Sequence, residues 1–370
     1  LHACQNRLKT AVLEEHQAIG EPVHCGECLS KLAIDRQNLK LPEKVISETV
    51  KGVRILFPNN QSIKLTEPGF VLEKHLFEQW LGKKAEQAGA EILLDHKVLD
   101  LKREKGLWEL KTNHGEIKSK IVIDASGVQS IVNQKLELNP RFESVIGVQF
   151  ELKDIPRDGY LDFHLWPHRA PNGYCWMIPK SNGRANVGLV TNQKNKAKAL
   201  CTEFVRQKGW EQKEIVKTFG GLIPASGPLP TTVSDGLMLV GDAAGFTSPM
   251  FEGGTQLGLQ SGKFAAQVAT QAIKENKWEK NKLQEYEHLW KKEFPRYGVL
   301  TKGKKALYAF SNEELNKIAS VLPSELNELK WKEKLIVGWR ILRHHPGLYR
   351  KSVLQAFKAF GYSQAKYYGW

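Results

Sequence analysis

The sequence predicts an α/β protein in which a parallel-sheet domain carries an inserted antiparallel sheet and a helical C-terminal region. Its 370 residues exceed the ~250–300 at which single cores stop growing, so we expect more than one structural unit. Short buried strands alternate with helices in two separate stretches, which is typical of a parallel sheet with crossover helices. Between these stretches apolar and polar residues alternate, which indicates antiparallel strands.

The composition is that of a globular protein. Hydrophobic residues make up 41% and charged residues 25%, which excludes a disordered or fibrous chain. No run of about 18 apolar residues occurs, so the sequence predicts no membrane-spanning helix.

The first part of the parallel-sheet domain is predicted over residues 1–141. A short strand at 10–14 ends in Glu14, a strand and an amphipathic helix follow over 69–90, and residues 121–124 form a further buried strand. In a dinucleotide-binding sheet, the acid that ends the second strand accepts hydrogen bonds from ribose hydroxyls, and Glu14 fits that place. The first strand and Gly-rich loop that would precede it do not occur in the sequence, so we expect this part to lack them.

The other parts follow in order along the chain. The inserted antiparallel sheet is predicted over residues 142–233, on alternating segments such as 145–152. The second part of the parallel-sheet domain, residues 234–273, begins with a buried strand at 237–242 and ends with a helix. Residues 274–370 form the helical C-terminal region.

The motif with the clearest chemical role is Gly-Asp-Ala-Ala-Gly, residues 241–245, which begins at the end of the strand predicted at 237–242. Small residues let a flat ligand approach the backbone, and a helix start directs N–H groups at negative charge. These features suit a flavin, because the reduced ring carries its negative charge along one edge. The residues expected to contact this cofactor are Gly241, Asp242, Ala243, Gly245, Pro249, Gly253 and Gly254.

Two further motifs carry a resemblance to a known family. Residues 22–27, Pro-Val-His-Cys-Gly-Glu, resemble P-V-x-C-G/A-E, and residues 171–179, Pro-Asn-Gly-Tyr-Cys-Trp-Met-Ile-Pro, resemble P-x-x-Y-x-W-x-F-P. Glu14, the helix start at 71–74, the Asp-Ala-Ser-Gly run at 124–127 and the Gly-Asp pair occur in the order seen in FAD-dependent enzymes of the p-hydroxybenzoate-hydroxylase-like fold. Over residues 7–272 the chain resembles the geranylgeranyl reductase family of that fold, and the last hundred residues match loosely.

The resemblance implies a Rossmann-like FAD-binding domain and a reductase that saturates C=C bonds of geranylgeranyl or other prenyl chains. It also implies that Tyr174, Trp176 and Pro179 line the cavity for the lipid chain. Tyr174 and Trp176 alternate along a strand, so both should face one side. Lys74 stands where the family usually has Arg on the adenosine side of FAD. Departures at Ile178, Cys28 and Glu252 are also present.

Hydride transfer to an isolated alkene requires a proton at the second carbon. Cys25 is the preferred proton donor, because the motif places it on the loop nearest the flavin ring. Tyr174 and a flavin-ordered water are alternatives, and an inert buried thiol is the other interpretation of Cys25. The electron donor is expected to be NADPH or reduced ferredoxin.

Two other functions fit the same sequence. Halogenases of this fold carry W-x-W-x-I-P, which residues 174–179 approach, so a flavin-dependent monooxygenase or halogenase is one alternative. A non-catalytic lipid-binding relative is the other.

Cysteine usage favours a reducing compartment, because five cysteines are too few and too odd in number for a disulfide framework. Cys25 and Cys28 have C-x-x-C spacing, but no second pair completes a zinc site, so we predict no metal.

The basic residues concentrate toward the C-terminus. The net charge is +14, and residues 271–370 contain 20 Lys and Arg against 10 Asp and Glu, together with five of the ten Trp. Such a surface suits anionic lipid, and no nucleic-acid motif is present. We therefore expect a cytoplasmic protein, peripheral at the inner membrane face. The sequence carries no signal for oligomeric state. The residues expected to meet the membrane are Lys332, Lys334, Arg340, Arg343, Arg350 and Lys351.

Overall fold

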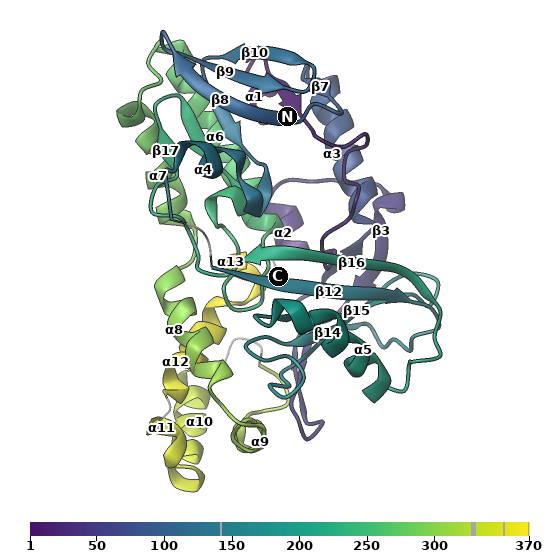
Figure 1. Ribbon diagram of the computed structural model, residues 1–370. Coiled ribbons are helices and arrows are strands. Elements are labelled where there is room, and N and C mark those ends of the chain that lie inside the picture. Colours follow the sequence, from purple (N-terminus) through teal and green to yellow (C-terminus); the bar gives the residue numbers. More distant parts are fainter. Residues whose placement is uncertain (141–142, 327–330, 351, 369) are drawn as a thin grey trace.

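The computed structural model describes residues 1–140, 143–326, 331–350, 352–368 and 370. Figure 1 shows an upper part of short strands and helices, a large sheet below it, and a column of C-terminal helices along one side. The α/β class, the inserted sheet and the helical C-terminal region predicted from the sequence are confirmed.

Two parallel strand pairs form the upper part. β1 (Ala11–Leu13) pairs with β7 (Glu91–Leu93), and β11 (Val122–Asp124) pairs with β18 (Leu237–Leu239). Between β1 and β7 the chain passes through α3 (Lys74–Gln87), as the helical spacing of that segment predicts. The other elements here are α1 (His2–Gln5), β8 (Val98–Glu104), β9 (Leu107–Thr112), β10 (Gly115–Ser119), α4 (Ile131–Leu136), β17 (Val233–Ser234), α6 (Thr255–Lys274) and α7 (Lys280–Glu293).

A seven-stranded sheet with the order β16-β12-β15-β14-β13-β4-β5 forms the lower part. Its strands are β4 (Gly52–Leu56), β5 (Ser62–Leu65), β12 (Ser144–Leu152), β13 (Tyr160–His164), β14 (Cys175–Pro179), β15 (Ala185–Thr191) and β16 (Ile215–Pro224). The sheet is larger than the 142–233 range expected for it, because β4 and β5 come from the first part of the chain. β4 joins β13 in parallel, so the sheet is mixed rather than purely antiparallel.

The two faces of this sheet belong to different cores. Cys175 and Met177 of β14 pack with α5 (Ala197–Gln207) on the outer face, whereas Trp176 and Ile178 belong to the large core on the inner face. This alternation follows from the two-residue period of a strand. The inner face therefore points toward the upper part and the helices.

A small three-stranded sheet connects the two parts. It has the order β2-β6-β3, with β2 (Cys28–Ser30), β3 (Ile46–Val50) and β6 (Gly69–Leu72) all antiparallel. α2 (Lys31–Arg36) begins at Ser30, whose side chain accepts a hydrogen bond from the Ala33 N–H. This N-cap fixes the direction in which the chain leaves β2.

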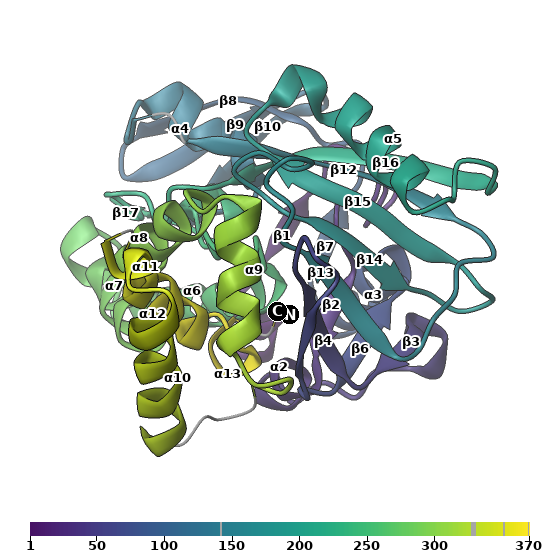
Figure 2. The ribbon, with the colours of Figure 1, turned by 90° about the horizontal axis from the view of Figure 1, so that it is seen from below.

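The C-terminal helices stack beside the large sheet, as the view from below in Figure 2 shows. α8 and α12 cross closely, because a Cβ at Gly303 would lie 1.9 Å from the Ala359 Cβ. Only glycine fits at that crossing. Among the described residues, no helix is both long and apolar enough to cross a membrane. The helices are α8 (Tyr297–Tyr308), α9 (Asn312–Val321), α10 (Trp331–His344), α11 (Gly347–Arg350), α12 (Val353–Tyr362) and α13 (Ala365–Tyr368).

Candidate active site

The Gly-Asp turn predicted to hold a cofactor lies at the carboxyl end of β18. Gly241 and Gly245 have φ of +54° and +77°, which are left-handed values that favour glycine. The Val240 N–H donates to the Asp124 carbonyl at 3.0 Å, so the turn lies directly beside the end of β11. In open α/β sheets ligands bind at this edge, outside the carboxyl ends of the strands.

The start of α6 lies against the same turn. A Cβ at Gly254 would lie 3.3 Å from Asp242 Oδ1 and 3.4 Å from Thr247 Oγ1. The Thr247 hydroxyl donates to Asp242 Oδ1 at 2.8 Å, and burial raises the pKa of Asp242. α6 is 20 residues long, and no side chain caps its N-terminus at Gly254. Its first N–H groups and dipole therefore favour an anion there.

These residues fit a flavin. The turn offers small side chains in Gly241, Ala243 and Gly245, a hydroxyl acceptor in Asp242, and an uncapped helix start at Gly253 and Gly254. Pro249 is buried in the loop between turn and helix. The structure therefore brings together all seven residues expected around the cofactor from 241 to 254.

Glu14 and Lys74 occupy different surroundings. Glu14 follows β1, and its carboxylate accepts from the His16 N–H at 2.9 Å and from His16 Nδ1 at 2.6 Å. Lys74 begins α3 and pairs with Glu78. Burial raises the pKa values of both Asp242 and Cys25, and the ammonium charge of Lys74 partly opposes each rise.

Cys25 lies on a loop between the upper part and the inner face of the large sheet. Its Sγ accepts a hydrogen bond from the Glu27 N–H at 3.2 Å, and its carbonyl accepts from Gln149 Nε2 at 2.9 Å. Burial raises the pKa of the Cys25 thiol, and the charge of Lys74 partly opposes that rise. Cys25 and Cys28 are both free thiols. The described residues contain no cluster of three or more His, Cys, Asp or Glu able to hold a metal.

Tyr174 and Trp176 face the same side of β14, with ring centroids 5.8 Å apart. The Tyr174 hydroxyl donates to the Phe251 carbonyl at 2.7 Å, which joins this aromatic wall to the loop before Gly253. Pro179 ends the strand and is buried. Burial, with the nearby Glu252, raises the pKa of Tyr174 well above its ordinary value.

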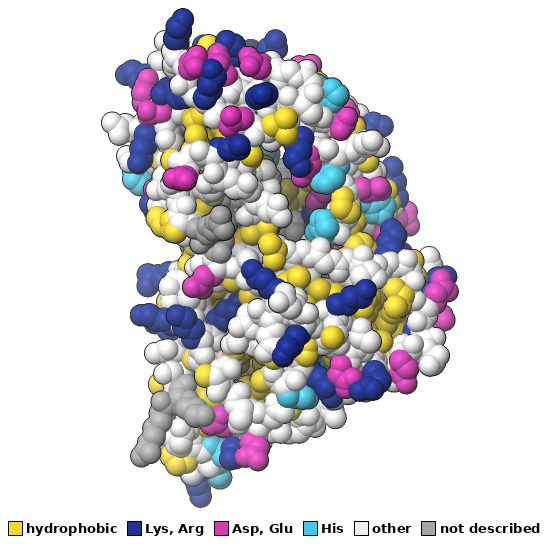
Figure 3. Space-filling model, in the orientation of Figure 1, with side chains coloured by type: hydrophobic (Ala, Val, Ile, Leu, Met, Phe, Trp, Pro, Cys, Tyr) yellow, Lys and Arg dark blue, Asp and Glu magenta, His cyan; other side chains and the backbone are white. Residues whose placement is uncertain are grey.

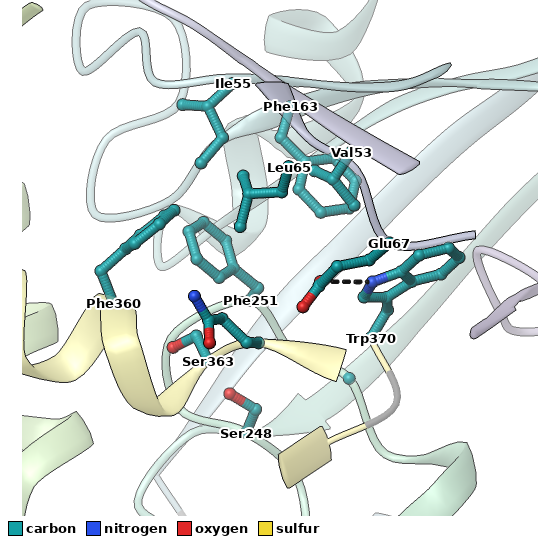
Figure 4. A pocket seen from close by; sticks show the side chains of 12 residues that line it. Val53, Ile55, Leu65, Glu67, Phe163, Ser248, Phe251, Phe360, Ser363 and Trp370 are labelled. Atoms are coloured by element: carbon teal, nitrogen blue, oxygen red, sulfur yellow. Dashed lines mark hydrogen bonds between the residues drawn. The ribbon is translucent and has the colours of Figure 1, made fainter. Parts of the chain in front are cut away.

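A cavity begins at residues 246–254, the segment between the Gly-Asp turn and α6, which is called the flavin loop below. It runs along the large sheet (Figure 4). Phe163 and Phe251 line it, and the Tyr174 ring packs behind both at 5.3 and 5.5 Å. Trp370 closes one end, where its Nε1 donates to Glu67 Oε2 at 3.1 Å. The residues around the cavity are Val53, Ile55, Leu65, Glu67, Phe163, Ser248, Phe251, Gly253, Phe360, Ser363, Gln364 and Trp370.

A second cavity lies next to the first, and every residue that lines it is apolar. Ile55 and Phe360 line both cavities, so the two adjoin. The second lies between the sheet and helices α8, α9 and α12. The sequence motifs do not point to these lining residues, although the alternation of Ile63 and Leu65 is typical of a half-buried strand. Its other lining residues are Phe57, Leu165, Met250, Leu307, Leu315, Ile318, Leu322, Leu326, Val353, Ala356 and Phe357.

Known proteins match this chain in sequence. Residues 143–223 match the family model described as the geranylgeranyl reductase catalytic domain. The chain is 32% identical over 350 residues to the digeranylgeranylglycerophospholipid reductase of Methanocaldococcus jannaschii, which covers 90% of this chain and 88% of that protein.

Solved structures share the fold. A geranylgeranyl bacteriochlorophyll reductase-like protein from Thermoplasma acidophilum superposes with a TM-score of 0.84 and 27% identity, over 96% of this chain and 94% of that one. A flavin-dependent brominase superposes with a TM-score of 0.71 over 98% of this chain and 95% of its own. At 16% identity, the brominase shows likeness of fold alone.

The fold and the comparisons define an FAD-dependent oxidoreductase with a Rossmann-like FAD-binding part. The chain belongs to the geranylgeranyl reductase family. Its reaction is the saturation of C=C bonds in prenyl chains, as the sequence motifs predict.

Proposed function

We propose that the substrate is a prenylated glycerophospholipid whose chain enters the two adjoining cavities, with Cys25 as the proton donor. The carrying observation is the apolar second cavity, which extends the first one away from Gly253 of the flavin loop. A wall without polar side chains suits a long hydrocarbon and offers nothing to a polar substrate. The name of the M. jannaschii relative, a digeranylgeranylglycerophospholipid reductase, supports this substrate class.

The chemistry divides between cofactor and protein. Bound FAD, once reduced, supplies a hydride to one carbon of the double bond. The thiol of Cys25 gives its proton to the other carbon, so the alkene gains two hydrogens in all. The raised pKa keeps the thiol protonated at neutral pH. The thiolate left behind is stabilised by the Glu27 N–H and the charge of Lys74, and it recovers a proton from water.

In this scheme Tyr174 forms part of the aromatic wall and does not transfer a proton. Its hydroxyl proton is already donated to the Phe251 carbonyl, and its raised pKa makes it a weak acid. The aromatic ring supports Phe163 and Phe251 from behind.

The electrons come from an external donor, NADPH or reduced ferredoxin. Anaerobic reduction of the bound flavin by each donor in turn, followed by its absorbance, distinguishes the two. The faster donor at physiological concentration is the physiological one.

Replacement of Cys25 tests the mechanism. Cys25→Ala should lower kcat about 10²- to 10³-fold, the usual value of a positioned general acid, with flavin content and KM little changed. Cys28→Ala is the matched control, because Cys28 is a second free thiol on the same segment, and its Sγ donates only a long hydrogen bond of 3.6 Å to the Gly26 carbonyl. The measurement is the mass gain of two hydrogens per double bond under anaerobic conditions. Unchanged turnover in Cys25→Ala removes the thiol from the mechanism, and product that requires oxygen favours a monooxygenase.

The same proposal includes docking of the C-terminal helices on an anionic bilayer. On α10, Ile336, Trp339 and Leu342 are 50%, 56% and 56% exposed. Arg340 and Arg343 are exposed on the same helix, and the Arg343 guanidinium lies 5.0 Å from the centre of the Trp339 ring. Exposed apolar residues interspersed with cations are typical of a helix that lies in the membrane interface. The side chains of Lys332, Lys334, Arg350 and Lys351 lie outside the described part of the structure.

Vesicle sedimentation tests this docking. Figure 3 shows further Lys and Arg side chains gathered over α8, which would favour the same anionic surface. Trp339→Ser should weaken binding to vesicles that contain anionic phosphatidylglycerol. Ile215→Ser is the control, because Ile215 is 54% exposed but lies on β16 of the sheet. Binding of the unmodified protein that is independent of anionic lipid and of salt would contradict the proposal.

A further inference from the structure

The inner face of the large sheet holds a buried polar array directly under the Cys25 loop. Trp176 is aligned with Gly188 on the neighbouring strand, and Gly188 with Gln149 on the next one. A Cβ at Gly188 would lie 2.5 Å from the Gln149 Cβ and 2.7 Å from the Trp176 ring. Glycine at position 188 therefore allows the side chains of Gln149 and Trp176 to meet.

Gln149 uses both ends of its amide. Its Oε1 accepts from Trp176 Nε1 at 3.0 Å, and its Nε2 donates to the Cys25 carbonyl at 2.9 Å. Gln149 is 3% exposed, so both hydrogen bonds are shielded from water. The aromatic wall and the Cys25 loop are thus joined through one buried side chain.

A second connection lies two residues further along the loop, at Glu27, and four residues further along the strand, at Lys180. Lys180 Nζ donates to Glu27 Oε2 at 2.7 Å, and Asn186 Nδ2 donates to the same oxygen at 2.7 Å. The Lys74 N–H donates to Glu27 Oε1 at 3.0 Å. The side chains of Glu27 and Lys180 are 1% and 2% exposed. Glu27 has φ of +72°, an unfavourable conformation that these contacts hold in place.

The charges around Lys180 are mutually paired. Its ammonium also lies 3.1 Å from Glu73 and 3.5 Å from Glu151, and Arg184 bonds the same two carboxylates at 2.7 and 2.8 Å. A buried charge that loses its partner is strongly destabilising, so these side chains are held in one arrangement. The cluster therefore fixes Glu27 in position as well as in charge.

Residues 25, 26 and 27 of the loop contact the inner face of the sheet one after another. A Cβ at Gly26 would lie 3.2 Å from the Ile178 Cδ1, so Gly26 packs on the side chain between the two connections. Trp176, Ile178 and Lys180 occupy alternate positions of one strand and its extension, on one face. Trp176 reaches Cys25 through Gln149, Ile178 packs against Gly26, and Lys180 forms an ion pair with Glu27.

The structure assigns Gln149 and Lys180 as positioning residues, which hold the Cys25–Glu27 loop at a fixed height over the aromatic wall. The assignment rests on the proposed function, because a proton donor must lie at a set place relative to the substrate, and the wall packs behind Phe163 and Phe251, which line the first cavity. A displacement of about 1 Å at a reacting group can cost ~10²-fold in rate. Neither residue touches the substrate cavities, so both act through Cys25 and Glu27.

Two variants of the full flavin-loaded chain test the assignment. Gln149→Met keeps the length of the side chain and removes both hydrogen bonds, and it leaves no charge unpaired. Lys180→Met removes the ion pair, and Glu27→Gln with Lys180→Met removes both charges, which restores folding if the single change impairs it. The matched controls are Gln134→Met, at an exposed residue, and Lys153→Met, at a half-buried residue whose ammonium pairs with Glu214. Gln149→Met and Lys180→Met should lower kcat for prenyl reduction ten- to a hundredfold, with KM within threefold of the unmodified enzyme.

Alkylation of Cys25 gives a readout that does not depend on activity. Peptide mass spectrometry follows iodoacetamide labelling of each cysteine, without substrate. Cys25 should label at least tenfold faster in Gln149→Met and Lys180→Met, while the fully buried Cys175 and Cys201 stay protected. Controls should label at the unmodified rate.

Three results overturn the assignment. Labelling of Cys25 at the unmodified rate in Gln149→Met shows that the loop is not held by this amide. Faster labelling of Cys175 and Cys201 as well shows a general loss of stability. A freed loop with unchanged kcat shows that its position does not matter. If the unmodified protein reduces no prenyl chain, the proposed function fails, and the labelling alone then decides whether Gln149 and Lys180 anchor the loop.

Discussion

His164 is a fully buried histidine at the end of β13, on the outer face of the large sheet. Among the described residues, neither of its ring nitrogens has a hydrogen-bond partner. The ring packs against Trp166 and Phe204, with centroids 4.7 and 5.3 Å away. Burial, with the charges of Lys208 and Arg54, lowers the pKa of His164 from 6.5 to about 3. The folded protein therefore holds this ring neutral at any ordinary pH.

The buried ring predicts a loss of stability in mild acid. The unfolded chain binds a proton at His164 below pH 6.5, whereas the folded chain binds one only near pH 3. Stability is therefore complete above pH 6.5 and falls as the pH drops toward 3. The loss at pH 5 should be about 2 kcal/mol from this residue.

His164→Phe should remove most of that loss, as denaturant unfolding at pH 7.5 and pH 5 would measure. The phenyl ring keeps the contacts with Trp166 and Phe204 and cannot be protonated. His288→Phe is the control, because His288 is exposed on α7 and should leave the pH dependence unchanged. Equal acid sensitivity in His164→Phe and the unmodified chain would contradict the explanation.

At the scale of single residues, the sequence predicts what local motifs encode. Gly241, Gly245 and Asp242 occupy the turn that their spacing indicates. Gln149 and Lys180 could not be predicted, because their partners Cys25 and Glu27 lie 124 and 153 positions away along the chain. Only the sheet register brings these pairs together.

At the scale of elements, α6 is tied to the flavin turn by one hydroxyl. Ser261 Oγ accepts from the Gly241 N–H at 3.0 Å and donates to the Gly258 carbonyl at 3.0 Å. Ser261 is fully buried, so no water replaces it. Ser261, in the second turn of α6, therefore fixes the distance between the Gly-Asp turn and the start of the helix.

Ser261→Ala should loosen the turn and weaken flavin binding. The buried Gly241 N–H would lose its acceptor, which costs ~1–1.5 kcal/mol, so the Kd for FAD should rise about tenfold. Titration of flavin-free protein, followed by quenching of flavin fluorescence, measures the change. Thr270→Val is the control on the same helix, because the Thr270 hydroxyl bonds only the Ala266 carbonyl, at 2.7 Å. Equal affinities in all three proteins would show that Ser261 does not shape the site.

Most elements near the site follow from the hydrophobic pattern of the sequence, and the exceptions have a physical cause. β1, α3, β11, β18 and α6 all fall where strand or helix periodicity indicates them. The pairing of β4 with β13 is different, because it joins segments about 108 residues apart. A strand pattern shows which residues are buried but not which strand lies beside them. The domain boundary at residue 142 missed β4 and β5 for that reason.

At the scale of the whole molecule, the two adjoining cavities are built from three separate regions of the chain. The wall comes from β4, β5 and β13, the flavin loop contributes Phe251 and Gly253, and the C-terminal helices close the other side. The helices also carry the exposed apolar face of α10. The proposed membrane docking and the proposed accommodation of the prenyl chain therefore both involve the same column of helices.

The length of the second cavity should decide which prenyl chains are reduced well. Ala356 of α12 lines that cavity and is 7% exposed. Ala356→Leu adds three carbons where the distal end of a long chain would lie. We expect kcat/KM for a geranylgeranyl lipid to fall about tenfold, or ~1.4 kcal/mol, while a geranyl lipid, which does not reach that far, stays within twofold.

The control and the melting temperature separate this effect from damage to the fold. Ala309→Leu changes an exposed alanine after α8 and should leave both substrates unaffected. Overpacking at Ala356 costs ~1–3 kcal/mol of stability, which thermal unfolding detects independently of activity. A folded Ala356→Leu variant that loses both substrates equally, or neither, would show that the chain does not run between the sheet and α12. A selective loss of the longer substrate would place its distal isoprene units against Ala356, because only a chain that reaches α12 can meet the added carbons.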